Sequence, residues 1–287
     1  MIMTVSYETP KKALTDSRAI RQKVFETVSE SNKKLTYGEL EKRLSQKFAV
    51  HKKALKTAIS ELVADRQLIY TYNLGCSFLE KSFNKPTRIS KRVVLKPPGM
   101  HYPPESGDVV IDIAQGASFG SGEHPTTRLA VGGIEAALSG NNRFLKTNPT
   151  RALDIGTGSG ILAITAVGLG VKKALAIDID PCSRSEAKIN IRLNTMEDRI
   201  QVLDRNIEQI NEKFSLVTAN LRYPTLTRLC SHILEITEQP GMVVLSGIKT
   251  HEVTDILDTY TRNGFTCAWK AVEKEWVGMV FVKSRHG

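Results

Sequence analysis

The fold of this chain is decided by the stretch DIGTGSG, which runs from Asp154 to Gly160. A predicted strand at 151–154 precedes it, and the apolar run Ile161–Ala166 follows it as a predicted helix. Glycines in a turn from strand to helix let the backbone adopt positive φ angles and approach a ligand closely. The stretch therefore predicts a binding loop at the end of a strand.

The glycine spacing selects among three kinds of nucleotide ligand. A dinucleotide loop needs glycine at the sixth position of G-x-G-x-x-G, where this chain has Ile161. A Walker loop needs Gly-Lys followed by Ser or Thr, and no lysine is present here. Alternating glycines after an acidic strand end suit a ligand without phosphates, whose amino-acid end needs backbone contacts and a nearby acid. We therefore expect S-adenosylmethionine as the cofactor.

A second acidic residue supports this expectation. Asp178 ends the next predicted strand, 18 residues after Gly160. A carboxylate in this position can accept hydrogen bonds from both ribose hydroxyls, as it does in dinucleotide-binding folds. Asp180 and Pro181 then begin the next helix.

The sequence around the loop alternates strands and helices. Predicted strands lie at 151–154, 174–178, 200–203, 214–218 and 242–246. The helical stretches between most of them favour an α/β fold with a parallel sheet and helices on both faces. After a helix at about 251–263, two long strands follow without a helix between them. We therefore expect an antiparallel pair to complete the sheet.

Composition and proline content divide the chain. Its 287 residues, 41% apolar and 24% charged, suit one large globular domain or two ordinary ones. Prolines and glycine cluster at 96–104, and proline disfavours helix in the residue before it. We predict a small N-terminal domain over 1–85, a Pro-rich linker over 86–107 and a cofactor-binding domain over 108–287.

The N-terminal part has the pattern of three helices and a hairpin. Asp16 can cap the first helix, and Thr36 and Glu39 have the spacing of a capping box for the second. A third helix is predicted at about 51–66, followed by a hairpin within 67–80. This order resembles a winged-helix domain of mixed α+β structure.

The net charge of +10 is concentrated at the N-terminus. Residues 1–96 carry 20 Lys and Arg against 9 Asp and Glu, a balance of +11, and the remaining residues carry 20 against 21, a balance of −1. Lys52, Lys53 and Lys56 lie in the first turns of the predicted third helix. Such asymmetry indicates an anionic partner, RNA or DNA, although a solvated basic face is an equal alternative.

Other features exclude several classes of protein. No apolar run approaches the roughly 18 residues of a membrane helix, and no signal peptide is visible. The four cysteines form no C-x-x-C pair, so neither structural zinc nor a disulfide framework is expected. We expect reduced thiols in a cytoplasmic protein that uses no metal and no membrane.

Three further motifs accompany the glycine loop: FGSGEHPTT at Phe119–Thr127, NLRYP at Asn220–Pro224 and KEWV at Lys274–Val277. Together with Asp178–Pro181 they closely resemble the methyltransferase family that acts on large-subunit ribosomal protein eleven, over about residues 108–285. The resemblance implies a class I S-adenosylmethionine-dependent fold. This fold is Rossmann-like, with a mostly parallel seven-stranded sheet and an antiparallel last strand.

The resemblance also implies roles at matching positions. The segment ahead of the sheet would cover the cofactor through Phe119, Ser121, Thr126 and Thr127. The loop would hold the methionine end through Asp154, Gly156, Thr157, Gly158 and Gly160. The ribose and adenine would be held by Asp178, Ile179 and Asn206.

Asn220 would line both the cofactor and the transfer site, and Tyr223 would share the catalytic role. Their spacing resembles the Asn-Pro-Pro-Tyr signature of amino-group methyltransferases, although Leu221 and Arg222 replace the prolines. The leading hypothesis is N-methylation of a protein amine, on lysine or an N-terminus, in a substrate such as a ribosomal protein. No dedicated general base is expected.

Two alternatives remain open from sequence. The chain could methylate amino groups of RNA or DNA bases, with the basic N-terminal domain binding nucleic acid, or it could act as a metabolite-sensing regulator. Retention of Asn220 and of the whole cofactor motif argues against the regulator. The family's substrate-recognition domain is ferredoxin-like, whereas residues 15–85 have a winged-helix pattern, so the chain departs from the family in the segment that recognises the substrate.

Overall fold

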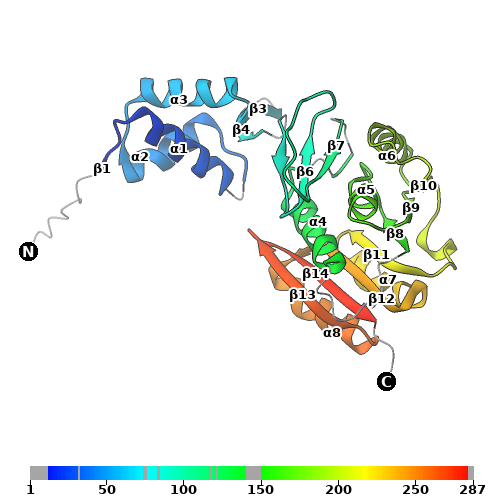
Figure 1. Cartoon of the computed structure of the whole chain (residues 1–287). Helices are drawn as coiled ribbons and strands as arrows, with labels where there is room; N and C mark the ends of the chain where they lie inside the picture. Colours follow the sequence, from blue (N-terminus) through cyan, green and yellow to red (C-terminus); the bar gives the residue numbers. More distant parts are fainter. Residues whose placement is uncertain are drawn as a thin grey trace, which may run out of the picture. The chain divides into compact units, whose positions relative to one another are not determined.

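The computed structural model describes residues 12–31, 33–73, 76–82, 85–114, 116, 118–120, 122–139 and 150–283. The chain divides into two compact units, Met1–Lys85 and Pro86–Gly287, referred to below as unit 1 and unit 2. Figure 1 shows the helices and strands of both units.

Unit 1 contains the three predicted helices and the predicted hairpin. Its elements are β1 (Lys12–Ala13), α1 (Ser17–Ser29), α2 (Tyr37–Lys47), β2 (Phe48–Ala49), α3 (Lys52–Ala64), β3 (Leu68–Asn73) and β4 (Cys76–Lys81). Asp16 caps α1 by accepting a hydrogen bond from Ala19 N at 2.8 Å, and the capping box of Thr36 and Glu39 begins α2. The local capping signals therefore place the helix starts correctly.

Each helix of unit 1 turns an apolar face inward. The shared core consists of Ile20, Val24, Val28, Leu35, Leu40, Leu44, Leu55, Ala58, Ile59, Leu62, Leu68 and Leu79. Strands β3 and β4 pair antiparallel, and Leu35 forms a further antiparallel bridge to Leu79 of β4. The hairpin is thereby attached to the segment that precedes α2.

Unit 2 is built on a seven-stranded sheet in the order β10-β9-β8-β11-β12-β14-β13. The strands are β8 (Arg151–Ile155), β9 (Lys173–Ile177), β10 (Ile200–Leu203), β11 (Phe214–Asn220), β12 (Thr237–Lys249), β13 (Thr266–Glu273) and β14 (Trp276–Lys283). Neighbouring strands are parallel except that β14 is antiparallel to β12 and β13. The predicted α/β class and the antiparallel last strand are confirmed.

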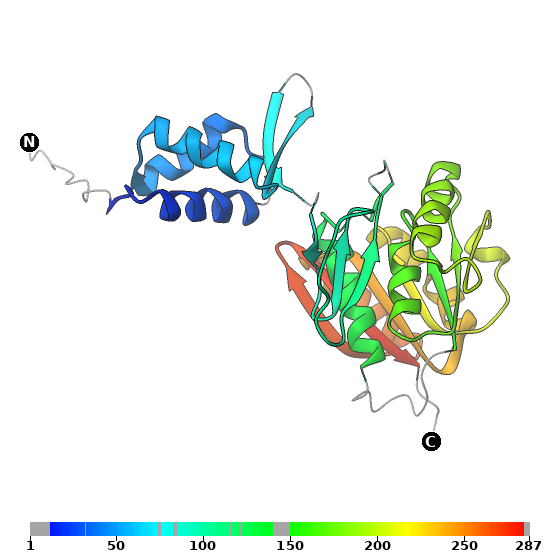
Figure 2. The ribbon, with the colours of Figure 1, turned by 45° about the horizontal axis from the view of Figure 1, so that its top comes forward.

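Helices cover both faces of this sheet. They are α4 (Pro125–Leu138), α5 (Ile161–Gly168), α6 (Pro181–Leu193), α7 (Tyr223–Ile236) and α8 (Val253–Arg262), with 3₁₀ turns η1 (Ile207–Gln209) and η2 (Thr250–Glu252). Helices α4, α5 and α6 share one buried apolar cluster, and α7 and α8 share the other. Figure 2 shows the ribbon of the sheet and its helices from a second direction. Because helices pack on both faces, the central strands are buried along almost their whole length.

The prediction of a Pro-rich linker over 86–107 is wrong for residues 87–88 and 93–96, which form strands. Strands β5 (Thr87–Arg88) and β6 (Val93–Lys96) form a three-stranded sheet with β7 (Val109–Asp112). Val93 and Leu95 are buried in the core that α4 and α5 share. The apolar run at 93–95 determines this structure, because the prolines at 97–98 come only after β6 has ended.

Candidate functional site

The glycine loop leaves β8 at its carboxyl end and leads into α5. Gly156, Gly158 and Gly160 have φ angles of 68°, 55° and 84°, which favour glycine over residues with a side chain. Backbone N–H groups of Gly156 and Thr157 donate to Ile177 O at 2.9 and 3.0 Å. These bonds fix the loop against the end of the neighbouring strand β9.

Asp178 follows β9 directly and accepts from the loop. Its Oδ2 accepts a hydrogen bond from Gly158 N at 2.9 Å, and its Oδ1 accepts one from Asp180 N at 2.9 Å. The side chain is half-buried, and Asp180 caps α6 by accepting from Cys182 N and Ser183 N. A carboxylate has about four acceptor positions, so Asp178 can still accept hydrogen bonds from a ligand.

A cavity of about 750 Å³ lies at the carboxyl ends of these strands. Its lining includes seven residues that the sequence predicted, which are Phe119, Gly156, Gly158, Asp178, Ile179, Asn206 and Asn220. In open parallel sheets, ligands bind at the carboxyl ends of the strands, at the point where the strand order changes direction. In this sheet that point lies at β8, because β9 and β10 follow on one side and β11 and β12 on the other. The volume falls within the usual range for small-molecule sites.

Two apolar side chains at this cavity are unusually exposed. Phe119 has 52% of its surface exposed and Ile179 has 71%. Large apolar groups rarely stay exposed together in a concave site unless a ligand covers them. Both side chains offer apolar surface against which an aromatic base can pack.

Asp154 does not line this cavity. The residue is 1% exposed, and its two carboxylate oxygens accept hydrogen bonds from Thr157 Oγ1 at 2.6 Å and Thr218 Oγ1 at 2.8 Å. Burial raises the pKa of Asp154 to about 6, an effect that the two hydroxyl donors reduce. The predicted contact with the methionine end is therefore corrected, since Asp154 braces the loop against β11 from inside the core.

Four more predicted residues face away from the cavity. Thr157 and Gly160 are buried in the loop, and Thr126 and Thr127 are buried in the first turn of α4. The hydroxyl of Thr157 is used by Asp154, and the carbonyl of Thr126 accepts from Ser246 Oγ at 2.9 Å. These four residues are therefore part of the core beside the site rather than of the cavity lining. Ser121 lies outside the described residues.

Tyr223, for which the sequence predicts a catalytic role, is not among the residues that line the cavity. Its hydroxyl donates to Asp255 Oδ2 of α8 at 3.3 Å, and its ring packs against the cluster that α7 and α8 share. Tyr223 is the first residue of α7, where the chain has already turned away from the end of β11. Asn220, the last residue of β11, is half-buried and lines the cavity.

The described residues at 119–120 and 122–124 are held in place by hydrogen bonds and ring contacts. Ser159 N donates to Phe119 O at 2.9 Å, and Ser159 Oγ donates to Gly120 O at 3.0 Å. A Cβ on Gly158 would lie 2.4 Å from Phe119 O, so only glycine allows this approach. The cavity wall formed by Phe119 therefore depends on the glycine loop itself.

Arg128 attaches the same segment to the end of β13. Its Nη1 donates to Gly122 O and to Glu123 O, both at 2.8 Å, while its Nε donates to both carboxylate oxygens of Glu273 at 3.0 and 3.1 Å. Nearby, the ring of His124 lies between those of Phe119 and Trp276, with centroids 5.2 and 5.1 Å away. Burial lowers the pKa of His124, which favours the neutral ring that caps α4.

Sequence reasoning missed more than half of the cavity lining. The missed residues are Ile155, Ile177, Ser183, Arg205, Ile207, Glu208, Gln209, Leu221, Thr225, Arg228 and Leu229. Many of them follow β10 or lie in the first turns of α7, so the rule that ligands bind at the carboxyl ends of strands could have selected these loops.

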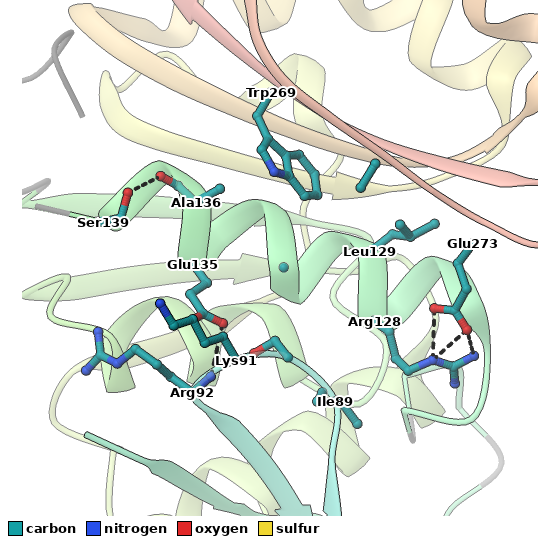
Figure 3. Close-up of a pocket in the computed structure, with 13 residues that line it drawn as sticks. Ile89, Lys91, Arg92, Arg128, Leu129, Glu135, Ala136, Ser139, Trp269 and Glu273 are labelled. Atoms are coloured by element: carbon teal, nitrogen blue, oxygen red, sulfur yellow. Dashed lines mark hydrogen bonds and ion pairs between the residues drawn. The ribbon is translucent and has the colours of Figure 1, made fainter. Parts of the chain in front are cut away.

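A second hollow, of about 480 Å³, lies elsewhere in unit 2 (Figure 3). Helix α4, strand β13 and the Ile89–Arg92 turn form its walls, with Trp269 on one side and the Arg128–Glu273 pair at one end. It contains none of the residues that the sequence predicted for cofactor binding. In the described part of the chain, no cluster of three or more His, Cys, Asp or Glu could hold a metal ion, and no helix is long and apolar enough to cross a membrane.

Comparison with known proteins accounts for this geometry. The family model of ribosomal protein L11 methyltransferase (PrmA) matches residues 77–284. The chain belongs to this family. Its glycine loop, Asp178 and Asn220 all lie within the matched region, whereas α1, α2, α3 and β3 of unit 1 lie before it.

Two curated relatives and one solved structure illustrate the similarity. The ribosomal protein L11 methyltransferase of Alkaliphilus oremlandii is 32% identical over 201 residues, which cover 70% of this chain and 62% of that protein. The protein of the same name from Geobacter sulfurreducens is 35% identical over 196 residues, covering 68% and 62%. The crystal structure of ribosomal protein L11 methylase from Lactobacillus delbrueckii subsp. bulgaricus superposes with a TM-score of 0.62 at 30% identity, covering 70% of this chain and 100% of that one. The chain thus spans less than two-thirds of the length of these curated relatives.

Proposed function

We propose that unit 2 is an S-adenosylmethionine-dependent methyltransferase that acts on an amine of a protein substrate. The observation that carries this proposal is the cavity at the carboxyl edge of the sheet, where the glycine loop, Asp178 and Asn220 meet. The family to which the chain belongs supports the same reaction.

The residues at the cavity fit this cofactor. The glycine loop lacks side chains where the methionine end would lie, and a Cβ on Gly156 would come within 2.7 Å of Leu221 Cδ2. Asp178 has spare acceptor positions for the ribose hydroxyls, and Phe119 and Ile179 offer apolar contacts for the base. No phosphate-binding lysine is needed, and the loop contains none.

The bound cofactor would supply an already activated methyl group on a sulfonium. The protein's contribution is then mainly alignment, which can remove up to about 7–11 kcal/mol of the barrier. Asn220 Oδ1 can accept a hydrogen bond from the attacking amine and orient its lone pair. Apolar walls such as Ile155 and Leu221 favour the neutral, nucleophilic form of a lysine amine, because desolvation lowers its pKa.

The substrate is proposed to be a ribosomal protein. The relatives are named for ribosomal protein L11, and the family model of the same name matches residues 77–284 of this chain. The match covers 62% of each of these relatives.

The test is transfer of tritiated methyl groups from S-adenosylmethionine to purified ribosomal protein L11, to total ribosomal protein and to RNA. We expect label in protein, at an amine, and a loss of most label with Asn220→Ala. Asn211→Ala, an exposed residue outside the cavity, is the matched control and should keep full activity. Label in RNA alone would overturn the protein-amine assignment, and absence of label in every fraction would overturn the proposed reaction.

A further inference from the structure

Most of unit 1 lies outside the part of the chain that matches the family, and this unit is strongly basic. Helices α1, α2 and α3 lie before the region that matches the family, and none of their residues lines the cavity of unit 2. Residues 1–85 carry 16 Lys and Arg against 9 Asp and Glu, a balance of +7 out of the total of +10. A small unit with this charge has the electrostatic character of a partner for a polyanion.

Helix α3 has two contrasting faces. Leu55, Ala58, Ile59 and Leu62 are buried in the core. The opposite face is exposed and polar, with Lys53, Lys56, Thr57 and Ser60. This face combines cations with hydroxyl groups, which are the side-chain types that contact phosphates and base edges.

The two lysines on this face have no acidic partner among the described residues. Lys52 pairs with Glu41 at 3.1 Å, whereas Lys53 and Lys56 form no ion pair with any residue that the structure describes. Lys56 Nζ lies 5.9 Å from the centre of the Tyr37 ring. Glu61, at the border of the face, is paired with Arg21 at 3.2 Å. The nearby acidic groups are thus neutralised, and two cations remain available to a ligand.

The surrounding elements match a helix-turn-helix with a flanking hairpin. Only Phe48–His51 separates α2 from α3, which is the usual length of the turn in this motif. Strand β3 packs beside α3 and pairs with β4 to form the hairpin. Leu35 pairs with Leu79 of this hairpin through a single β-bridge. Tyr70 of β3 is 51% exposed.

We infer that unit 1 is a winged-helix module that binds duplex DNA, with α3 in the major groove. The 13-residue helix has the diameter of about 10–12 Å that fits a major groove about 12 Å wide. Lys53 and Lys56 contact phosphates, and Thr57 and Ser60 face base edges. Duplex RNA is the poorer partner because its major groove is deep and narrow and does not admit a helix.

The test uses the full chain and fluorescence anisotropy with labelled DNA of about 20 base pairs, two helical turns. Binding is measured between about 50 and 200 mM salt, where each phosphate contact contributes about 0.9 to the log–log slope. The double variant Lys53→Gln/Lys56→Gln should weaken binding at least about tenfold and reduce the slope by about 1.8. The matched control is Lys172→Gln/Lys188→Gln, which removes the same charge from exposed positions in unit 2.

Three results would overturn the inference. The first is no binding of DNA at low salt, and the second is an equal loss of binding in both double variants. The third is tighter binding of a hairpin RNA than of the DNA duplex, since that would exclude a helix in the groove. The assay contains no cofactor and no methyl acceptor, so its outcome is independent of the proposed methyl transfer.

Discussion

Replacing Asp154 with asparagine removes a buried carboxyl group while keeping its shape. Burial raises the pKa of Asp154 from 3.8 to about 6. At about 1.4 kcal/mol per pKa unit, this shift of roughly two units corresponds to about 3 kcal/mol. Because the folded-state pKa lies above the unfolded value, the stability that the protonated group provides is complete below about pH 4. It is lost as the pH rises through about 6.

The amide introduced by Asp154→Asn cannot ionise, so the stability of this variant relative to the wild type should rise by about 3 kcal/mol between about pH 3 and pH 8. The chain has two tryptophans, Trp269 and Trp276, and both lie in unit 2. Urea unfolding followed by their fluorescence therefore reports the unfolding of unit 2. Asp198→Asn, which removes an exposed carboxylate from the same unit, is the matched control. A stability difference for Asp154→Asn that stays constant with pH would refute the argument.

Three other substitutions test the site. Arg128→Gln removes the contacts to Glu273 and to the loop carbonyls, so it should destabilise unit 2 by about 2 kcal/mol in urea unfolding and weaken cofactor binding in a titration. Gly158→Ala places a Cβ 2.4 Å from Phe119 O at a φ of 55°, so calorimetry should show cofactor affinity reduced at least about tenfold. Asn220→Ala should lower the single-turnover rate about 10- to 150-fold with little change in cofactor affinity. An unchanged rate would show that Asn220 takes no part in methyl transfer.

Local signals in the sequence predicted the elements of both units well. The capping residues Asp16 and Thr36 lie next to the helices that they begin, and the alternation of strands and helices indicates a parallel sheet directly. The strands β5 and β6 were not predicted, because the sheet that they form depends on pairing with a distant segment. Strand β6 pairs in parallel with β7, whose residues begin 13 positions after β6 ends, and no local pattern shows that pairing.

The candidate site was predicted where the backbone determines it. A glycine loop, the residue after β9 and the last residue of β11 must meet at one edge of a parallel sheet, so Gly158, Asp178 and Asn220 follow from topology. The direction of a side chain does not follow in this way. Asp154 points into the core and Tyr223 points toward α8, although both lie beside residues that line the cavity.

We propose that the cavity beside the glycine loop binds S-adenosylmethionine through Asp178. Isothermal titration with S-adenosylhomocysteine, the demethylated product, measures this binding directly. We predict one site per chain in the wild type and about 10- to 150-fold weaker binding in Asp178→Ala, which corresponds to the loss of a charged hydrogen bond. Asp198→Ala changes the net charge equally at an exposed position outside the cavity and should bind as the wild type does. Equal affinity of the Asp178→Ala and wild-type proteins, or no binding by either, would contradict the claim.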